Sequence, residues 1–110
     1  MNGPQPLVEG TWELSILTPL GRQHTVLALT RHDNRLTGTM RDVRHGEQVE
    51  LTGLEQHGAR LTWAQSITRP LRLNLTFDVT VDGTAMTGQA RAGRLPASRV
   101  TGHRTTPADG

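Results

Sequence analysis

Hydrophobic and polar residues alternate over "PLRLNLTFDVTVDG", residues 70–83, and this alternation limits the fold more than any other feature of the chain. The apolar side chains that fall on one face are Leu71, Leu73, Leu75, Phe77, Val79 and Val81. A strand with one buried face sorts its side chains in this way, whereas a helix would scatter them around its axis. Asp82 and Gly83 follow, and both tolerate the positive φ that a two-residue hairpin requires. The stretch predicts a half-buried strand that returns through a hairpin.

The same alternation recurs along the chain, and clusters of Asp, Asn, Gly and Pro separate the apolar runs. The expected strands cover residues 9–17, 22–30, 35–42, 47–55, 59–67, 71–81, 84–91 and 97–104. Short connections between about eight antiparallel strands indicate an all-β, up-and-down barrel. We expect a single barrel domain over residues 8–104, with disordered tails at residues 1–7 and 105–110.

The composition excludes several classes of function. With 110 residues, of which 34% are hydrophobic, the chain has room for one modest core. It has no Cys, so neither a disulfide framework nor a thiolate site is expected. All 12 basic residues are Arg, they are spread from Arg22 to Arg104, and the formal net charge is only +2. Because few aromatic side chains are present to stack bases, we do not expect a nucleic-acid partner.

The beginning of the chain, "MNGPQPLVEG", has neither the basic region nor the apolar region of a signal peptide. No apolar run approaches the roughly 20 residues that a membrane span requires. We therefore expect a cytoplasmic protein without a membrane partner.

A short phrase, an apolar residue followed by Thr-Gly, recurs and ends at Gly38, Gly53, Gly88 and Gly102. In each copy the apolar residue and the glycine share one face of the strand. If that face points inward, the missing side chains could leave space for a ligand. Alternatively, glycine permits the strong coiling that a small barrel needs. Both explanations are compatible with the sequence.

The first and last expected strands each carry a residue suited to closing one end of the barrel. "GTW" at residues 10–12 begins the first strand, and "VTGHR" ends the last strand at Arg104. These strands are neighbours in a closed meander, so Trp12 and Arg104 can meet. A guanidinium stacked on an indole contributes about 0.5–2 kcal/mol, and here it would form the barrel floor.

This pairing resembles the calycin superfamily, which includes lipocalins, fatty-acid-binding proteins and avidins. Its members share a Gly-x-Trp in the first strand and a basic residue of the last strand packed across it. The avidin-like pattern is the nearest, since "GTW", "RLTGTM" and "VTGHR" occur in matching order within residues 10–104. Positions that contact biotin in avidins correspond here to Leu14, Met40 and Arg104, so biotin is not the expected ligand. The resemblance implies a barrel whose mouth admits one small, mostly apolar molecule.

The side chains expected to face the interior and contact such a molecule are Trp63, Gln65, Leu14, Met40, Phe77 and Met86. Most of them are apolar, so the pocket would be hydrophobic and adaptable. Trp63 is the expected pocket wall, and its N–H needs a partner if it is buried. Gln65 lies on the same face and could orient a ligand carbonyl or lie at a solvated rim. The alternative is that these residues form an ordinary core.

The second expected strand is apolar on both faces. One face carries His24, Val26 and Ala28, and the other carries Thr25, Leu27 and Leu29. One of the two faces could therefore cover a homodimer interface. His24 is the only candidate catalytic residue: it could act as a general acid or base if it points into the barrel, and otherwise it is an exposed histidine. No histidine pair has metal-ligand spacing, so we expect no metal and no other cofactor.

Three functions fit these features. The first is a shape-directed cyclase or isomerase of secondary metabolism, which folds a flexible apolar substrate inside the barrel. Orientation alone supplies about 7–11 kcal/mol to such a reaction, so no acid–base motif is required. The second is a non-catalytic binder of a hydrophobic small molecule. The third is a filled barrel that serves as a dimeric assembly module.

Overall fold

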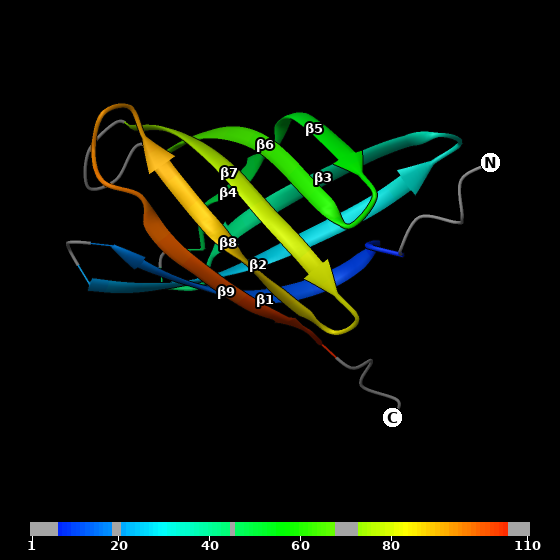
Figure 1. The fold of residues 1–110 in the computed structure, drawn as a ribbon, viewed down its shortest axis with the longest axis horizontal. Helices are drawn as coiled ribbons and strands as arrows, with labels where there is room; N and C mark the ends of the chain where they lie inside the picture. Colours follow the sequence, from blue (N-terminus) through cyan, green and yellow to red (C-terminus); the bar gives the residue numbers. More distant parts are fainter. Residues whose placement is uncertain (1–6, 19–20, 45, 68–72, 106–110) are drawn as a thin grey trace.

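The computed structural model describes residues 7–18, 21–44, 46–67 and 73–105, and in these residues it contains strands and no helix. The strands form one antiparallel sheet in the order β4-β3-β2-β1-β9-β8-β7-β6-β5, which curls into a nearly closed barrel (Figure 1). Their bounds are β1 Gly10–Thr18, β2 Gly21–His32, β3 Arg35–Asp42, β4 Gln48–Glu50, β5 Thr52–His57, β6 Arg60–Ile67, β7 Leu73–Asp82, β8 Ala85–Ala92 and β9 Ser98–Arg104. The predicted all-β, up-and-down barrel is confirmed.

The described residues hold nine strands rather than about eight because the strand expected at residues 47–55 is divided. β4 pairs with β3 and β5 pairs with β6, and Leu51 lies between the two segments. The Leu51 N–H donates to the carbonyl of Gly38 at 3.0 Å, and Gly53 adopts a φ of +63°. A residue with a side chain rarely adopts this backbone conformation. The bent segment thus leads from one edge of the sheet to the other.

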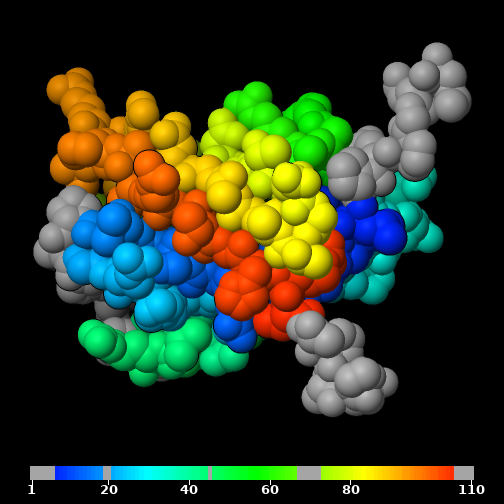
Figure 2. Space-filling view, turned by 60° about the horizontal axis from the view of Figure 1, so that its bottom comes forward, coloured from blue at the N-terminus to red at the C-terminus, as the bar shows by residue number. Residues whose placement is uncertain are grey.

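The first and last strands complete the barrel. β1 pairs with β2 on one side and with β9 on the other, so that Trp12 has Leu27 and Arg104 as its cross-strand partners. In the space-filling view, the orange-red β9 crosses the molecule directly beside the blue β1 (Figure 2). Residues far apart in the sequence are therefore neighbours at both ends of the barrel.

The strand that carries the clearest alternation is β7. Phe77, Val79 and Val81 are 2%, 1% and 4% exposed, as one buried face requires. Leu71, which the pattern placed on the same face, lies outside the described residues. The hairpin to β8 forms where the sequence predicted it: Asp82 pairs with Ala85, and Gly83 has a φ of +64°.

The core fills most of the barrel interior. Its buried apolar residues are Val8, Trp12, Leu14, Ile16, Leu27, Leu29, Met40, Leu61, Trp63, Phe77, Val79, Val81, Met86, Ala90 and Val100. In β2 the inward face is the one that carries Leu27 and Leu29, while Val26 and Ala28 are half-buried on the outer face. Leu27 and Leu29 are thus core residues and not part of an interface; a dimer formed through β2 would use the outer face.

Three of the recurring glycines are sites of close strand approach. A Cβ on Gly88 would collide with the carbonyl oxygen of Asp78, and one on Gly102 would collide with the side chain of Leu14. A Cβ on Gly38 would lie 2.8 Å from Leu29. The space beside these glycines is occupied by neighbouring strands, which favours the coiling explanation over ligand space. Gly53 instead has open surroundings and the positive φ of the bend.

Trp12 and Arg104 meet at one end of the barrel, here called the floor. The guanidinium carbon of Arg104 lies 4.4 Å from the ring centroid of Trp12. The same guanidinium donates to the carbonyls of Glu9 and Leu7, and the indole N–H of Trp12 donates to the carbonyl of Val8 at 3.0 Å. Val8 is fully buried. The segment before β1 is thereby held across the floor.

Part of each expected tail belongs to the described residues. Thr105 donates through its N–H to the carbonyl of Thr11 at 2.9 Å, and Leu7 accepts from Arg104. The rest of the expected tails, residues 1–6 and 106–110, lies outside the described residues.

Candidate functional site

A cavity of about 60 Å³ lies at the end of the barrel opposite the floor, here called the mouth. It is formed where β1 and β3 end, where β2 and β7 begin, and beside β4 and the end of β6. The residues that line it are Ile16, Gln23, Thr25, Met40, Asp42, Glu47, Val49, Gln65, Leu75 and Phe77. Because inward positions alternate along each strand, six strands contribute one or two side chains each.

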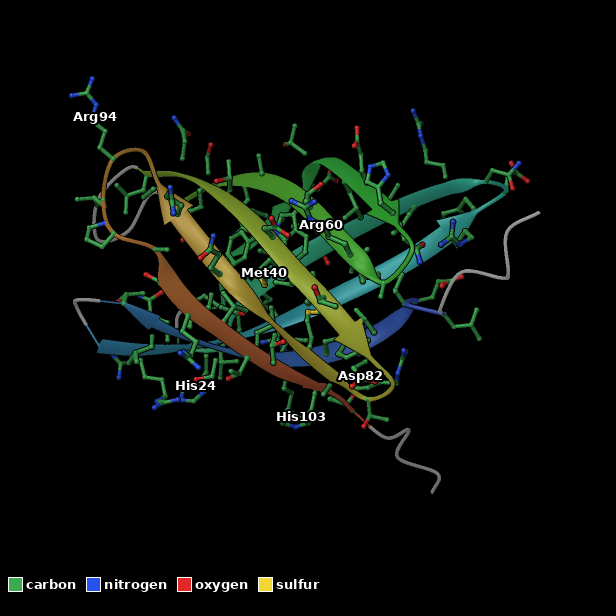
Figure 3. All side chains as sticks on the ribbon, in the orientation of Figure 1. His24, Met40, Arg60, Asp82, Arg94 and His103 are labelled. Carbon is green, nitrogen blue, oxygen red and sulfur yellow. The ribbon has the colours of Figure 1, made fainter. Side chains whose placement is uncertain are left out.

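The deeper wall of the cavity is apolar. Ile16, Met40 and Phe77 are each less than a tenth exposed, and Figure 3 shows Met40 within the barrel. Behind Phe77 lies Trp63, its cross-strand partner, with ring centroids 4.9 Å apart and an angle of 9° between the ring planes. This stacking stabilises the phenyl ring in its position in the cavity wall.

A buried amide is held beside this aromatic pair. The Trp63 Nε1–H donates to Gln65 Oε1 at 3.0 Å, and the Gln65 side chain is only 6% exposed. An indole N–H can only donate, so the oxygen of the amide must face it. The amide NH₂ is the other branch of a side chain that lines the cavity.

A residue with a buried hydroxyl lines the same cavity. Thr25 is 8% exposed, and its Oγ1 has no hydrogen-bond partner among the described residues. Thr25 follows the inward alternation of β2, which continues to Leu27 and Leu29. A buried polar group without a partner costs about 1–3 kcal/mol of stability. Such a group is uncommon in a folded protein.

Carboxylates lie at the outer edge of the cavity. Asp42 Oδ1 accepts from the N–H of Arg44 at 3.0 Å, and the Asp42 N–H donates to the carbonyl of Glu47 at 2.8 Å. These bonds define the turn between β3 and β4. Among the described residues that line the cavity, Asp42 and Glu47 are the ionisable ones, and both are acidic.

The structure brings together half of the side chains expected to contact a ligand. Met40, Gln65 and Phe77 line the cavity. Leu14 and Met86 lie deeper in the core, 2% and 0% exposed. Trp63, which was expected to form the pocket wall, does not line the cavity either.

The ring of Trp63 packs on Phe77, and its N–H bonds to Gln65. Sequence reasoning did not identify Thr25, Gln23, Asp42 or Glu47 as site residues. The available signal was the inward alternation of β2, which places Thr25 on the face of Leu27 and Leu29.

His24 is exposed on the outside of the barrel (Figure 3). It lies opposite Ser15 of β1, in a shallow surface hollow that also includes Arg22 and Thr101. The general acid–base role required an inward side chain, and the alternation of β2 turns His24 the other way. The described residues contain no group of three or more His, Cys, Asp or Glu side chains placed to hold a metal ion.

The ion pairs that shift pKa values lie away from the cavity. Arg60 donates to both carboxylate oxygens of Asp78, at 2.9 and 2.6 Å, which lowers the pKa of Asp78 and raises that of Arg60. Near the floor, a backbone hydrogen bond and then the guanidinium of Arg31 lower the pKa of Glu9 against the opposing effect of burial. Arg31 also donates to Gln56 at 2.6 Å. These contacts brace the outer surface and one end of the sheet.

Fold and cavity together define an antiparallel up-and-down β-barrel with a small, partly polar cavity at its mouth. Comparison of the chain with protein-family models, with curated proteins and with solved structures gave no match. In the part of the chain that the structure describes, no helix has the length and apolar character needed to cross a membrane.

Proposed function

We propose that this protein is a calycin-like, cytoplasmic barrel that binds a small, mostly apolar molecule at its mouth. The observation that carries the proposal is Thr25, a residue that lines the same cavity as Gln65 and whose buried hydroxyl lacks a partner among the described residues. An ordinary core would place an apolar side chain at such a position, since burial of an unpaired hydroxyl is costly. A few polar groups in an apolar cavity are typical of small-molecule sites.

The size of the cavity limits how the molecule binds. Pockets that enclose a drug-sized ligand have volumes of about 300–1,000 Å³. The mouth cavity, at about 60 Å³, has room for one end of such a molecule only. We infer that the ligand inserts one end and leaves the rest at the rim near Glu47 and Val49.

This size also favours binding over catalysis. A shape-directed cyclase or isomerase must enclose the reacting chain so that its ends are held in position. Core residues such as Leu14 and Met86 occupy the interior that a folded substrate would need. We therefore propose a binding function without turnover.

The filled interior also supports a second candidate, a barrel that acts as a dimeric assembly module. Val26 and Ala28 form a half-buried apolar strip on the outer face of β2. In this case Val26→Arg yields a folded monomer, whereas Leu27→Arg disrupts the core and unfolds the protein. Size-exclusion chromatography with light scattering distinguishes these results; a wild-type monomer contradicts the module.

Native mass spectrometry of protein purified gently from its own host tests the binding function. We expect a bound small molecule on the wild type and its loss in Thr25→Leu, whose larger side chain enters the cavity. His24→Leu introduces the same leucine one residue away on the outer face and should retain the bound mass. Near-UV circular dichroism verifies that both variants are folded. A wild type without bound mass, or equal retention by both variants, contradicts the proposal.

A further inference from the structure

The two buried polar side chains of the mouth cavity, Gln65 and Thr25, can each donate a hydrogen bond to a ligand. Gln65 Oε1 accepts from the Trp63 N–H, and the NH₂ of this cavity-lining side chain keeps its donors for a ligand. Thr25 Oγ1 has an unused hydrogen and unused lone pairs, because no described residue bonds to it. The deepest polar groups of the site are thus an amide that donates and a hydroxyl that can donate.

The residues around these donors restrict the partner further. Ile16, Leu75 and Phe77 form an apolar surround, in which a group with several unpaired donors of its own would be penalised. An ionised ligand carboxylate would lose its water in this apolar surround, and the described residues that line the cavity include no cationic side chain to pair with it. A neutral oxygen with free lone pairs avoids both penalties, since it brings neither unpaired donors nor a charge into the cavity.

We propose that the mouth cavity selects molecules that insert a neutral carbonyl oxygen, which accepts hydrogen bonds from the Gln65 NH₂ and the Thr25 hydroxyl. This inference rests on the proposed binding function and adds the chemical class of the inserted group. Trp63 acts here as a positioning residue: it binds the amide oxygen and so turns the NH₂ toward the ligand. A site that binds by hydrophobicity alone would prefer a hydrocarbon, because the carbonyl must give up its bonds to water.

The test uses two probes of the same shape, 2-pentanone and 2-methyl-1-pentene, in which a carbonyl oxygen replaces a methylene group. Each is titrated into ¹⁵N-labelled protein and followed by NMR. We expect the ketone to bind about tenfold more tightly than the alkene, because its two hydrogen bonds in the site outweigh the bonds to water that it gives up by about the net worth of one charge-neutral hydrogen bond. The side-chain amide resonances of Gln65 should shift on addition of the ketone and not of the alkene.

Variants at Thr25 separate the hydroxyl from the shape of the site. Thr25→Val keeps the shape and should lose most of the preference for the ketone, whereas Thr25→Ser keeps the hydroxyl and should retain it. Thr87→Val, on the exposed face of β8, is the matched control and should bind as the wild type does.

The remaining outcomes are distinct. If both probes bind equally well, or the alkene binds more tightly, and Thr25→Val changes neither affinity, the carbonyl inference is overturned while the binding function stands. If neither probe shifts any resonance of the mouth residues, the proposed binding function fails and the inference fails with it.

Discussion

The hydroxyl of Thr25 is buried without a partner among the described residues, and valine has nearly the same shape without the hydroxyl. We therefore predict that Thr25→Val raises the free energy of unfolding by about 1 kcal/mol in the absence of ligand. Urea unfolding followed by tryptophan fluorescence measures this change. A site residue that costs stability in this way is expected where binding, and not packing, determines its identity.

The control for this prediction is Thr87→Val, where the same replacement is made at an exposed position of β8. It should change the free energy of unfolding by no more than about 0.5 kcal/mol. A Thr25→Val variant that is less stable than the wild type would mean that the hydroxyl is satisfied in solution, and the argument from its burial would not hold.

At the floor, the geometry of one guanidinium connects three parts of the chain. Arg104 stacks on Trp12 and donates to two carbonyls of the segment before β1, those of Leu7 and Glu9. Lysine keeps the positive charge but lacks the planar fork that reaches both carbonyls. We predict that Arg104→Lys lowers the free energy of unfolding by about 2 kcal/mol, measured by urea unfolding. Stability equal to that of the wild type would show that charge alone supports the floor.

At the scale of the strands, glycines set how closely neighbours approach. Gly88 of β8 lies against β7, and a Cβ at this position would collide with the carbonyl oxygen of Asp78. Gly88→Ala must push the two strands apart, and we predict a loss of about 1–3 kcal/mol in the free energy of unfolding. Thermal and urea unfolding provide the measurement. The adjacent exposed substitution Gln89→Ala should cost less than about 0.5 kcal/mol, and equal losses would argue against a packing role for Gly88.

Strand identity could be predicted from sequence wherever one face is buried and the other solvated, as in β7, because burial imposes the alternation directly. The division of the strand expected at residues 47–55 could not be predicted in this way. The segment pairs first with β3 and then with β6, and the positive φ of Gly53 belongs to the bend between these pairings. The inward face of β2 was ambiguous because Val26 and Ala28 make its outer face apolar too. Pairing with β1 decides it, by placing Leu27 beside Trp12.

The candidate site was predicted only in part for a related reason. Gln65 could be found because it continues the face of Trp63 on one strand. Trp63 was expected in the pocket wall, but stacking on Phe77 and bonding to Gln65 place it in the core behind the wall. Thr25 becomes conspicuous only when β1 and β3 enclose it, since an unpaired hydroxyl is a property of three-dimensional surroundings.

At the scale of the whole molecule, the composition of ionisable groups leads us to expect that acid affects stability more than alkali does. The chain has no Lys, Tyr or Cys, and its 12 basic side chains are guanidinium groups that stay protonated. Side-chain protons are therefore exchanged mainly by the carboxylates and histidines. Among the described carboxylates, Asp78 and Glu9 have lowered pKa values in the folded protein.

A lowered pKa in the folded state determines the direction of the pH dependence. The hydrogen bonds from Arg60 lower the pKa of Asp78, so the unfolded chain takes up a proton at a higher pH than the folded one. The stabilisation is fully present above the unfolded pKa of about 4 and is lost as the pH falls through the folded pKa. Both side chains are largely exposed, 60% for Arg60 and 42% for Asp78, so the effect is modest and screened by salt.

We predict that Asp78→Asn is less stable than the wild type at pH 7. The difference should begin to shrink below about pH 4, where the unfolded chain takes up its proton, and should disappear as the pH falls through the lowered pKa of the folded wild type. Urea unfolding at pH 7, 5, 4 and 3 in low salt measures both curves. Arg60→Met removes the other partner of this ion pair, and its difference in stability from the wild type should shrink over the same pH range. A difference that stays constant over this range would assign the effect of Asp78→Asn to packing of the outer surface, and the Arg60–Asp78 pair would then contribute nothing to the acid sensitivity of the barrel.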